Sequence, residues 1–321
     1  MSTPEYLEEL LDLERELTFA GLSQLSGLVG EDELAFTETW PFIPATRRLD
    51  LLSRLSDMAD DNPEFDFYSI FCQALHDEET GIRIQAVQSL WETEDRRTIS
   101  KLIDRLEQDS SDEVRASAAQ VLGHFAALAD AGKLSTRDTE RVWTSLIAAL
   151  ENGDEPLMVR RRALEAIAVF RDQGLRSWIQ WGYDHTDSLL RQSAVYAMGR
   201  TCDPAWLDIL IEEMENEDPS MRYEAANAVS DIGEEEALPH LAELIADLDA
   251  QVAMAALHSI AGIGGAKARA MLRAYASNAD EPAIQEAAEE ALAELEADST
   301  GFSMMNVRSD LDDRYKNDDA L

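Results

Sequence analysis

The sequence predicts an all-α protein: an α-solenoid, in which antiparallel helix pairs stack into a right-handed superhelix. One pattern occurs twice between Asp187 and Gly233: an acidic residue, an arginine four positions later, and then small apolar residues. The two arginines, Arg191 and Arg222, stand 31 residues apart, and a fixed period of about twenty to fifty residues is typical of repeat architectures. The frame recurs at Arg83, Arg115, Arg160, Ala253 and Gln285. Together with Arg191 and Arg222, these positions are separated by 31 or 32 residues, except for the 45 residues between Arg115 and Arg160.

Each repeat carries the signals of a helix. The acidic residue that precedes the arginine, as at Asp187 and Asp218, can cap a helix and interacts favourably with its dipole. Apolar residues then recur at spacings of three and four, which defines one face of a helix. In the second copy they are Met221, Ala225, Ala226 and Val229. The glycines expected to form left-handed caps near helix ends are Gly123, Gly199, Gly233 and Gly264.

Residues 1–63 are predicted to form an N-terminal helical cap. A first helix is expected to begin at Thr3, which can cap it, and to run to about Phe19. Two further helices are expected over 32–40 and 47–59. Trp40 lies between them in the segment Trp-Pro-Phe-Ile-Pro, whose prolines exclude a helix. This aromatic cluster either docks a partner or covers the open end of the stack, as terminal repeats must.

Residues 64–296 are predicted to form about seven helix pairs. The expected pairs are 65–76 with 79–92, 97–108 with 112–126, 137–150 with 156–170, 174–183 with 187–200, 204–215 with 218–232, 236–247 with 249–262, and 266–276 with 282–296. The long interval contains an insertion around 129–135, which we expect to form a loop and to lengthen a first helix. The tail, 297–321, is polar and acidic without apolar periodicity, so it is predicted to be disordered.

The repeat frame resembles the HEAT repeat. It is similar to the HEAT-like subtype of phycobilisome lyases, with the signature Asp-x-x-Val-Arg-x-x-Ala-Ala-x-x-Leu-Gly, which Asp218-Pro-Ser-Met-Arg-Tyr-Glu-Ala-Ala follows closely. The resemblance covers roughly 64–296 and implies an α-solenoid. It does not imply a shared activity, because a fold does not determine a function.

The chain is strongly acidic, with 65 acidic and 27 basic residues among 321 and a net charge of −38. Nucleic acid is not expected as a direct ligand, since neutralising phosphates requires a basic surface. The acidity is either an adaptation to salt or a surface that attracts a basic partner protein. With no apolar run of membrane-spanning length and no basic N-terminal region, we expect a cytoplasmic protein without membrane contact. The sequence does not predict an oligomeric state.

Motifs for common enzyme chemistry are not recognised. None of the five histidines is followed by a glutamate, whereas helical-repeat di-iron hydroxylases of similar fold depend on His-Glu motifs, so their activity is not carried over. The glycine-rich segment 262–267 superficially resembles a phosphate loop but lacks its spacing and the preceding strand. We therefore expect no catalytic residue, no cofactor and no metal ion.

The repeated arginines have two interpretations. They form either a basic strip for an acidic ligand or a structural ladder, in which each arginine pairs with a carboxylate at a helix N-terminus of its own or the neighbouring repeat. The regular acid four residues earlier favours the ladder, because arginine suits partly buried bidentate pairs. The ladder residues are Arg83, Arg115, Arg160, Arg191 and Arg222.

A second row occupies the position five residues after each arginine, which the apolar face skips. It includes Tyr196, Asn227 and His258 on second helices, which line the concave side of solenoids. Aromatic and arginine side chains often carry interface energy. The predicted partner-binding residues are Trp91, His124, Arg162, Tyr196, Arg200, Asn227 and His258. A plain solvent-exposed row would explain the pattern equally well.

These observations predict a non-enzymatic protein–protein interaction scaffold or adaptor that binds a partner on its concave face. An alternative from another class follows from the resemblance alone: an assembly factor or bilin lyase-like protein acting on a pigment protein. A structural module within a larger complex is a third interpretation. On the favoured interpretation the protein is not an enzyme.

Overall fold

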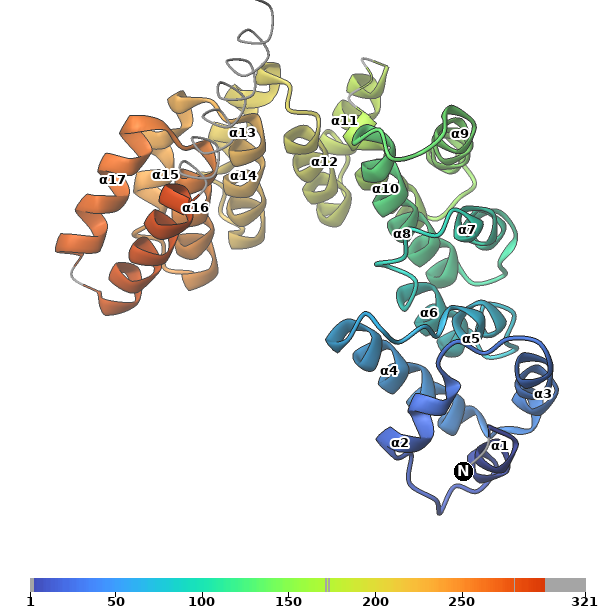
Figure 1. Cartoon of the computed structure of the whole chain (residues 1–321). Helices are drawn as coiled ribbons and strands as arrows, with labels where there is room; N and C mark the ends of the chain where they lie inside the picture. The colour runs from blue at the N-terminus through green and yellow to red at the C-terminus, as the bar shows by residue number, and fades with distance from the viewer. Residues whose placement is uncertain (1–2, 171, 173, 280, 298–321) are drawn as a thin grey trace, which may run out of the picture. The chain divides into compact units, whose positions relative to one another are not determined.

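The structure, a computed structural model, describes residues 3–297 except 171, 173 and 280 (Figure 1). Every regular element in that part of the chain is an α-helix or a 3-10 helix, which confirms the predicted all-α α-solenoid. The chain divides into two compact units, unit 1 (Met1–Phe170) and unit 2 (Arg171–Leu321). The domain boundaries inferred from the sequence stay predictions, and the predicted disordered tail lies, from residue 298 onward, outside the described residues.

Unit 1 begins with a helical N-terminal region and continues with three helix pairs. The N-terminal helices are α1 (Thr3–Leu10), α2 (Phe19–Leu22), η1 (Ser23–Leu25), α3 (Glu31–Thr39), η2 (Trp40–Phe42) and α4 (Ala45–Asp61). The pairs are α5 (Tyr68–Ala74) with α6 (Thr80–Gln88), α7 (Arg97–Gln108) with α8 (Asp112–Asp130), and α9 (Thr136–Glu151) with α10 (Leu157–Ile167), followed by η3 (Ala168–Phe170). The insertion in the long repeat therefore extends α8 as well as α9.

Unit 2 continues the same arrangement. Its helices are α11 (Leu175–Tyr183) with α12 (Ser188–Arg200), η4 (Pro204–Trp206) and α13 (Leu207–Glu213) with α14 (Pro219–Ile232), η5 (Glu235–Ala237) and α15 (Leu238–Leu244) with α16 (Ala250–Ile263), and α17 (Gly265–Asn278), with a last helix over 282–297. Each of these helices overlaps the range predicted for it.

The first helix is shorter than predicted, because it ends at Leu10 and not near Phe19. Arg47, whose side chain is buried, donates hydrogen bonds from Nη2 to three backbone carbonyl oxygens in the turn that follows α1. These belong to Asp12 (3.0 Å), Leu13 (3.0 Å) and Arg15 (2.5 Å). A continuing helix would use such carbonyls itself, so the guanidinium replaces helical hydrogen bonds here.

Trp40 belongs to the core of unit 1. Its side chain is 3% exposed, and its indole Nε1–H donates to Asp77 Oδ2 at 2.7 Å. Arg48 donates to the same oxygen at 2.5 Å, so the buried Asp77 has two side-chain donors. Trp40 is therefore a core residue, whereas the neighbouring Phe42 is exposed.

The ladder arginines reach from one repeat to the next. Arg83 donates from Nε and Nη2 to the two carboxylate oxygens of Asp109, both at 2.9 Å, and Arg222 does the same to Asp247 at 2.7 and 2.8 Å. Each of these aspartates also accepts the backbone N–H two residues later, just before the next second helix. The bidentate carboxylate therefore comes from the following repeat and not from four residues earlier.

Two of the other ladder arginines also reach the following repeat, with different partners. Arg115 donates to Glu155 at 2.7 Å and Arg191 to Glu213 at 3.2 Å, both acids of the following repeat. Arg160 is the exception, because it donates to the carbonyl oxygen of Leu150 at 3.0 Å, within its own helix pair. The contacts of Arg115 and Arg191 join consecutive repeats of the stack.

Neighbouring second helices approach closely at small residues. A Cβ added to Gly199 would lie 2.6 Å from the Cα of Ala228, and one on Gly123 would lie 3.2 Å from the Cβ of Ala166. Both glycines lie within helices, so their prediction as left-handed caps is wrong. Gly233 forms the left-handed cap expected of it, whereas Gly264 ends α16 with a positive φ of 69° but a ψ of −157°, outside the left-handed helical conformation.

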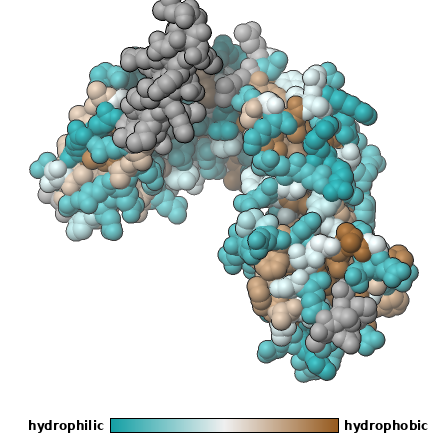
Figure 2. Space-filling view, viewed as in Figure 1, coloured by the Kyte–Doolittle hydropathy of each residue, from teal (hydrophilic) through white to brown (hydrophobic). Residues whose placement is uncertain are grey.

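The described surface is mostly polar. Figure 2 shows hydrophilic residues over much of both units in this view, with hydrophobic side chains in small patches. None of the helices in the described ranges is long and apolar enough to span a membrane.

Candidate functional site

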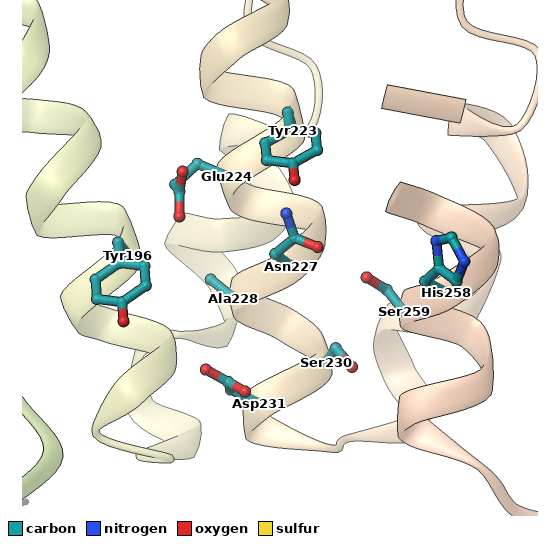
Figure 3. A pocket seen from close by; sticks show the side chains of 9 residues that line it. All are labelled: Tyr196, Tyr223, Glu224, Asn227, Ala228, Ser230, Asp231, His258 and Ser259. Atoms are coloured by element: carbon teal, nitrogen blue, oxygen red, sulfur yellow. The ribbon is translucent and has the colours of Figure 1, made fainter. Parts of the chain in front are cut away.

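The second helices of three consecutive repeats in unit 2 form a row, in which α14 packs against both α12 and α16 (Figure 3). Each begins at an aspartate whose carboxylate accepts first-turn backbone N–H groups: Asp187, Asp218 and Asp249. Because the frame repeats every 31 residues, equivalent frame positions come to equivalent places on the three helices. The residues brought together in this way are Tyr196, Asn227 and His258.

A pocket of about 390 Å³ lies on this row. Its lining comes from three helices: Tyr196 of α12, Tyr223, Glu224, Asn227, Ala228, Ser230 and Asp231 of α14, and His258 and Ser259 of α16. Tyr196 and Tyr223 are 39% and 40% exposed, so both are accessible to a ligand. The hydroxyl groups of Ser230 and Ser259 add polar atoms to the lining.

Two carboxylates and one phenol ring share one side of the pocket. In Figure 3, Glu224 and Asp231 extend from α14 toward the helix that carries Tyr196, and the ring lies at a level between them. Glu224 accepts a long hydrogen bond, 3.5 Å, from Gln192 Nε2. Carboxylates beside an exposed aromatic ring suit an alkylammonium or guanidinium cation, through charge-assisted hydrogen bonds and cation–π attraction.

Arg200 brings a positive charge to the edge of this pocket. Its Nη1 lies 3.4 Å from Asp231 Oδ2, and the two side chains are 36% and 38% exposed. An ion pair with this exposure contributes about 0–1 kcal/mol. Arg200 therefore holds Asp231 weakly, and an incoming cation can compete for the same carboxylate.

The seven predicted partner-binding residues divide between the two units. Unit 2 brings Tyr196, Asn227 and His258 into one pocket, with Arg200 at its edge. In unit 1, Trp91 and His124 adjoin each other, with ring centroids 6.3 Å apart. Arg162 donates from Nη1 to Glu165 Oε2 at 2.7 Å on its own helix. That these residues bind a partner stays a prediction.

The sequence interpretation missed Tyr223, Glu224 and Asp231. It followed one position per repeat, whereas the pocket also draws on several positions of a single helix. The missed signal is the spacing of Tyr223, Asn227 and Asp231, which are four residues apart and so lie along one face of α14. A polar and aromatic face of this kind on a second helix could have been read from the sequence.

A metal centre does not fit the described residues. Among them, no group of three or more His, Cys, Asp or Glu side chains is placed to hold a metal ion. The pocket contains one histidine, His258, and the pocket carboxylates Glu224 and Asp231 extend toward Tyr196 on the neighbouring helix. We therefore derive no iron-dependent reaction from these residues.

The fold and the pocket define a class: an α-solenoid of helix pairs with a polar, aromatic pocket on its second helices. A family model described as HEAT repeats matches residues 68–136, 144–215 and 190–261, which is more than half of the chain. The chain belongs to the HEAT repeat family.

Curated relatives are similar over part of their length. Deoxyhypusine hydroxylase of Rattus norvegicus is 28% identical over 117 residues, which cover 36% of this chain and 39% of that protein. Deoxyhypusine hydroxylase of Drosophila pseudoobscura pseudoobscura is 29% identical over 172 residues, covering 52% and 55%. Among solved structures, the complex of CpcE and CpcF of phycocyanin lyase from Nostoc is 18% identical with a TM-score of 0.52, covering 88% of this chain and 97% of that one. This last likeness concerns the fold alone.

The relatives overturn the predicted function. The sequence interpretation favoured a non-enzymatic interaction scaffold and excluded an enzyme, whereas the curated relatives are enzymes by name. The prediction relied on the absence of recognisable catalytic motifs, the His-Glu motif among them, and such an absence does not exclude an enzymatic relationship. The likeness to phycocyanin lyase does not restore the pigment-protein alternative, because a fold shared at this identity does not carry an activity.

Proposed function

We propose that this chain recognises an amine-bearing side chain of a protein substrate, of the lysine-derived kind that deoxyhypusine represents, in the pocket formed by α12, α14 and α16. The observation that carries the proposal is the pair of carboxylates, Glu224 and Asp231, on the same side of the pocket as the exposed ring of Tyr196. A chain with a net charge of −38 also attracts cationic protein segments over a distance. The cytoplasmic location expected from the sequence is part of this proposal.

The chemistry of the lining supports an elongated amine. An ammonium group needs acceptors, which the two carboxylates supply, and its methylene stem needs apolar contact, which the tyrosine rings and Ala228 supply. The volume of about 390 Å³ falls within the range of small-molecule sites. Recognition would precede any reaction, and the proposal concerns recognition.

Calorimetric titration of the full chain with three peptides tests the proposal. The peptides carry deoxyhypusine, lysine or the uncharged norleucine at one position and are otherwise identical. We expect binding to weaken in that order, with norleucine at least about tenfold weaker than deoxyhypusine, since a lost charge-assisted contact corresponds to about 1.5–3 kcal/mol. Equal affinity for norleucine and deoxyhypusine would show that the pocket does not recognise an amine.

Three variants test whether the pocket carboxylates bind the amine. Glu224→Gln removes a pocket carboxylate and should weaken deoxyhypusine binding by about tenfold, as estimated for one charged contact. Glu215→Gln removes an exposed carboxylate outside the pocket and should leave the affinity unchanged. Arg200→Ala releases Asp231 and should strengthen binding, whereas loss of an arginine that contacted the ligand would weaken it.

A separate experiment measures reaction in place of binding. Mass spectrometry of the peptide after incubation with the chain, ferrous iron and dioxygen shows whether the peptide gains an oxygen atom.

A further inference from the structure

A second pocket of about 450 Å³ lies within unit 1, where the end of α4, the start of α5 and the segment after α6 meet. The residues of its lining that matter most are Asp60, Phe65, Asp66, Phe71, Trp91 and Glu92. It is formed by unit 1 alone, and its residues are distinct from those of the pocket between α12, α14 and α16 in unit 2, called the amine pocket below.

The floor of this pocket is a row of packed aromatic rings. The Phe65 ring stacks on Phe67, with centroids 5.7 Å apart and planes at 13°, and Phe67 meets Phe71 edge to face at 6.4 Å. Phe67 and Phe71 are 2% and 4% exposed, so this row is anchored in the core. Phe19, which is largely exposed, packs edge-on against Phe65 and extends the apolar rim.

Trp91 stands out from the repeat pattern. It lies eight residues after Arg83, at the frame position that Gly123 and Gly199 occupy after their own arginines. The helix α6 ends at Gln88, and Trp91 follows it with 44% of its side chain exposed. Where two other repeats have glycine and others have alanine or serine (Ala168, Ser230 and Ala261), this repeat therefore presents a large aromatic surface.

The histidine next to Trp91 adds no positive charge that would repel a cation. His124 lies 6.3 Å from Trp91 between ring centroids, and within the described ranges its Nε2 is buried without a hydrogen-bond partner. Burial lowers the pKa of His124, against the opposing influence of Glu94 and Glu92. The imidazole is therefore neutral at pH 7.

The charges of the rim are of one sign. Asp60, Asp66 and Glu92 are exposed, no lysine or arginine lines the pocket, and none of the three carboxylates forms an ion pair with a described residue. An exposed tryptophan with uncompensated carboxylates around it attracts a cationic side chain. Arginine fits better than lysine, because a planar guanidinium stacks on an indole and donates to carboxylates at the same time.

We infer that this pocket docks an arginine of a partner protein, with the guanidinium on the ring of Trp91 between the carboxylates and the flanking apolar residues on the phenylalanine row. Charge complementarity identifies the occupant, because every charged residue of the lining is acidic and the exposed ring of Trp91 lies among them. The inference goes beyond the proposed amine recognition and does not depend on it.

Nuclear magnetic resonance of the ¹⁵N-labelled full chain tests this docking. The Trp91 indole N–H signal is identified by its loss in Trp91→Phe. The probe is the peptide acetyl-Leu-Arg-Leu-amide, and its matched control carries citrulline, which has the shape of arginine without the charge. We expect the Trp91 signal to shift and saturate with the arginine peptide and to shift little with citrulline. An unchanged signal, or equal shifts with both peptides, would overturn the inference.

A charge variant provides an independent check. Asp60→Asn with Glu92→Gln keeps the shape of the pocket and should weaken the arginine peptide by about tenfold or more, by the loss of charge-assisted contacts. Asp57→Asn removes an exposed carboxylate of α4 outside the pocket and should leave affinity unchanged. Unaltered affinity in the double variant contradicts the assignment. Glu224→Gln should not affect this signal, so failure of one site is distinguished from failure of the other.

Discussion

Asp247 performs two tasks at one turn of the stack. It accepts two hydrogen bonds from the guanidinium of Arg222, at 2.7 and 2.8 Å, and the backbone N–H of Asp249 at 2.9 Å. The hydrogen bond from Arg222 outweighs partial burial and lowers the pKa of this carboxyl. A single ionised side chain thus joins two repeats and holds the backbone of Asp249, the residue that caps the following helix.

We expect Asp247→Asn to make this contribution visible as a dependence on pH. Because the pKa of Asp247 is lower in the folded chain, the carboxylate stabilises the fold above its unfolded pKa of about 3.9 and ceases to do so as the pH falls through the folded value. The variant should therefore unfold more easily than the wild type by about 2 kcal/mol at pH 7, a typical value for hydrogen bonds to charged groups. The difference should shrink below about pH 4.

The measurement is urea denaturation of both proteins from pH 7 down to pH 2, followed by circular dichroism. Only the difference between the two is informative, because protonation also relieves repulsion throughout an acidic chain. Asp208→Asn, an exposed position on α13, should change the free energy of unfolding by less than about 0.5 kcal/mol. A constant difference between wild type and Asp247→Asn at all pH values would contradict the assigned role.

At the scale of helices, the spacing between second helices depends on residues without room for a side chain. Gly199 of α12 faces Ala228 of α14, which also lines the amine pocket. Small alanines on both helices bring the backbones together, and the neighbouring positions then carry the pocket residues. The distance between α12 and α14 therefore determines how Tyr196 meets Glu224 and Asp231.

Gly199→Ala should separate these helices. Alanine favours a helix over glycine by about 0.5–1 kcal/mol, but the new Cβ would lie 2.6 Å from the Cα of Ala228. Overpacking of this kind costs about 1–3 kcal/mol, so we expect net destabilisation. Gly81→Ala in α6 is the matched control, since its Cβ would contact nothing within 4 Å, and it should stabilise the chain. Thermal unfolding of the two variants decides the matter: similar shifts for both would mean that α12 and α14 are not closely packed at Gly199.

At the scale of the whole molecule, charge dominates. A net charge of −38 on 321 residues places like charges within reach of one another throughout both units. The exposed ion pairs between a few arginines and carboxylates compensate little of this, because each contributes only about 0–1 kcal/mol. Self-repulsion therefore opposes folding in dilute salt.

The melting temperature should accordingly rise with sodium chloride, and mostly at low concentration. The screening length falls from about 30 Å at 0.01 M to about 10 Å at 0.1 M, so most of the repulsion is screened within that range. Scanning calorimetry at several salt concentrations measures the effect. A melting temperature that stays flat or falls would mean that repulsion does not limit stability, and a rise confined to molar salt would indicate solute exclusion instead.

The sequence by itself determined the helical repeat and the residues that recur in it. Caps such as Asp187 and Asp218, the apolar spacing and the 31-residue period depend on neighbours within one or two helical turns, and such local preferences are written in the order of residues. The period also placed Tyr196, Asn227 and His258 at equivalent positions, and they line one pocket.

Only the tertiary structure decided which side chains meet across repeats. Arg83 finds Asp109 and not Glu79, Arg47 ends the first helix at Leu10, and Glu224 and Asp231 join Tyr196, because each contact depends on how adjacent helices pack and not on sequence distance. Periodicity specifies the face of a helix, but the residue opposite that face comes from another repeat. For this reason the sequence could predict the row of pocket residues, and the acids that give the pocket its chemistry required the packed helices.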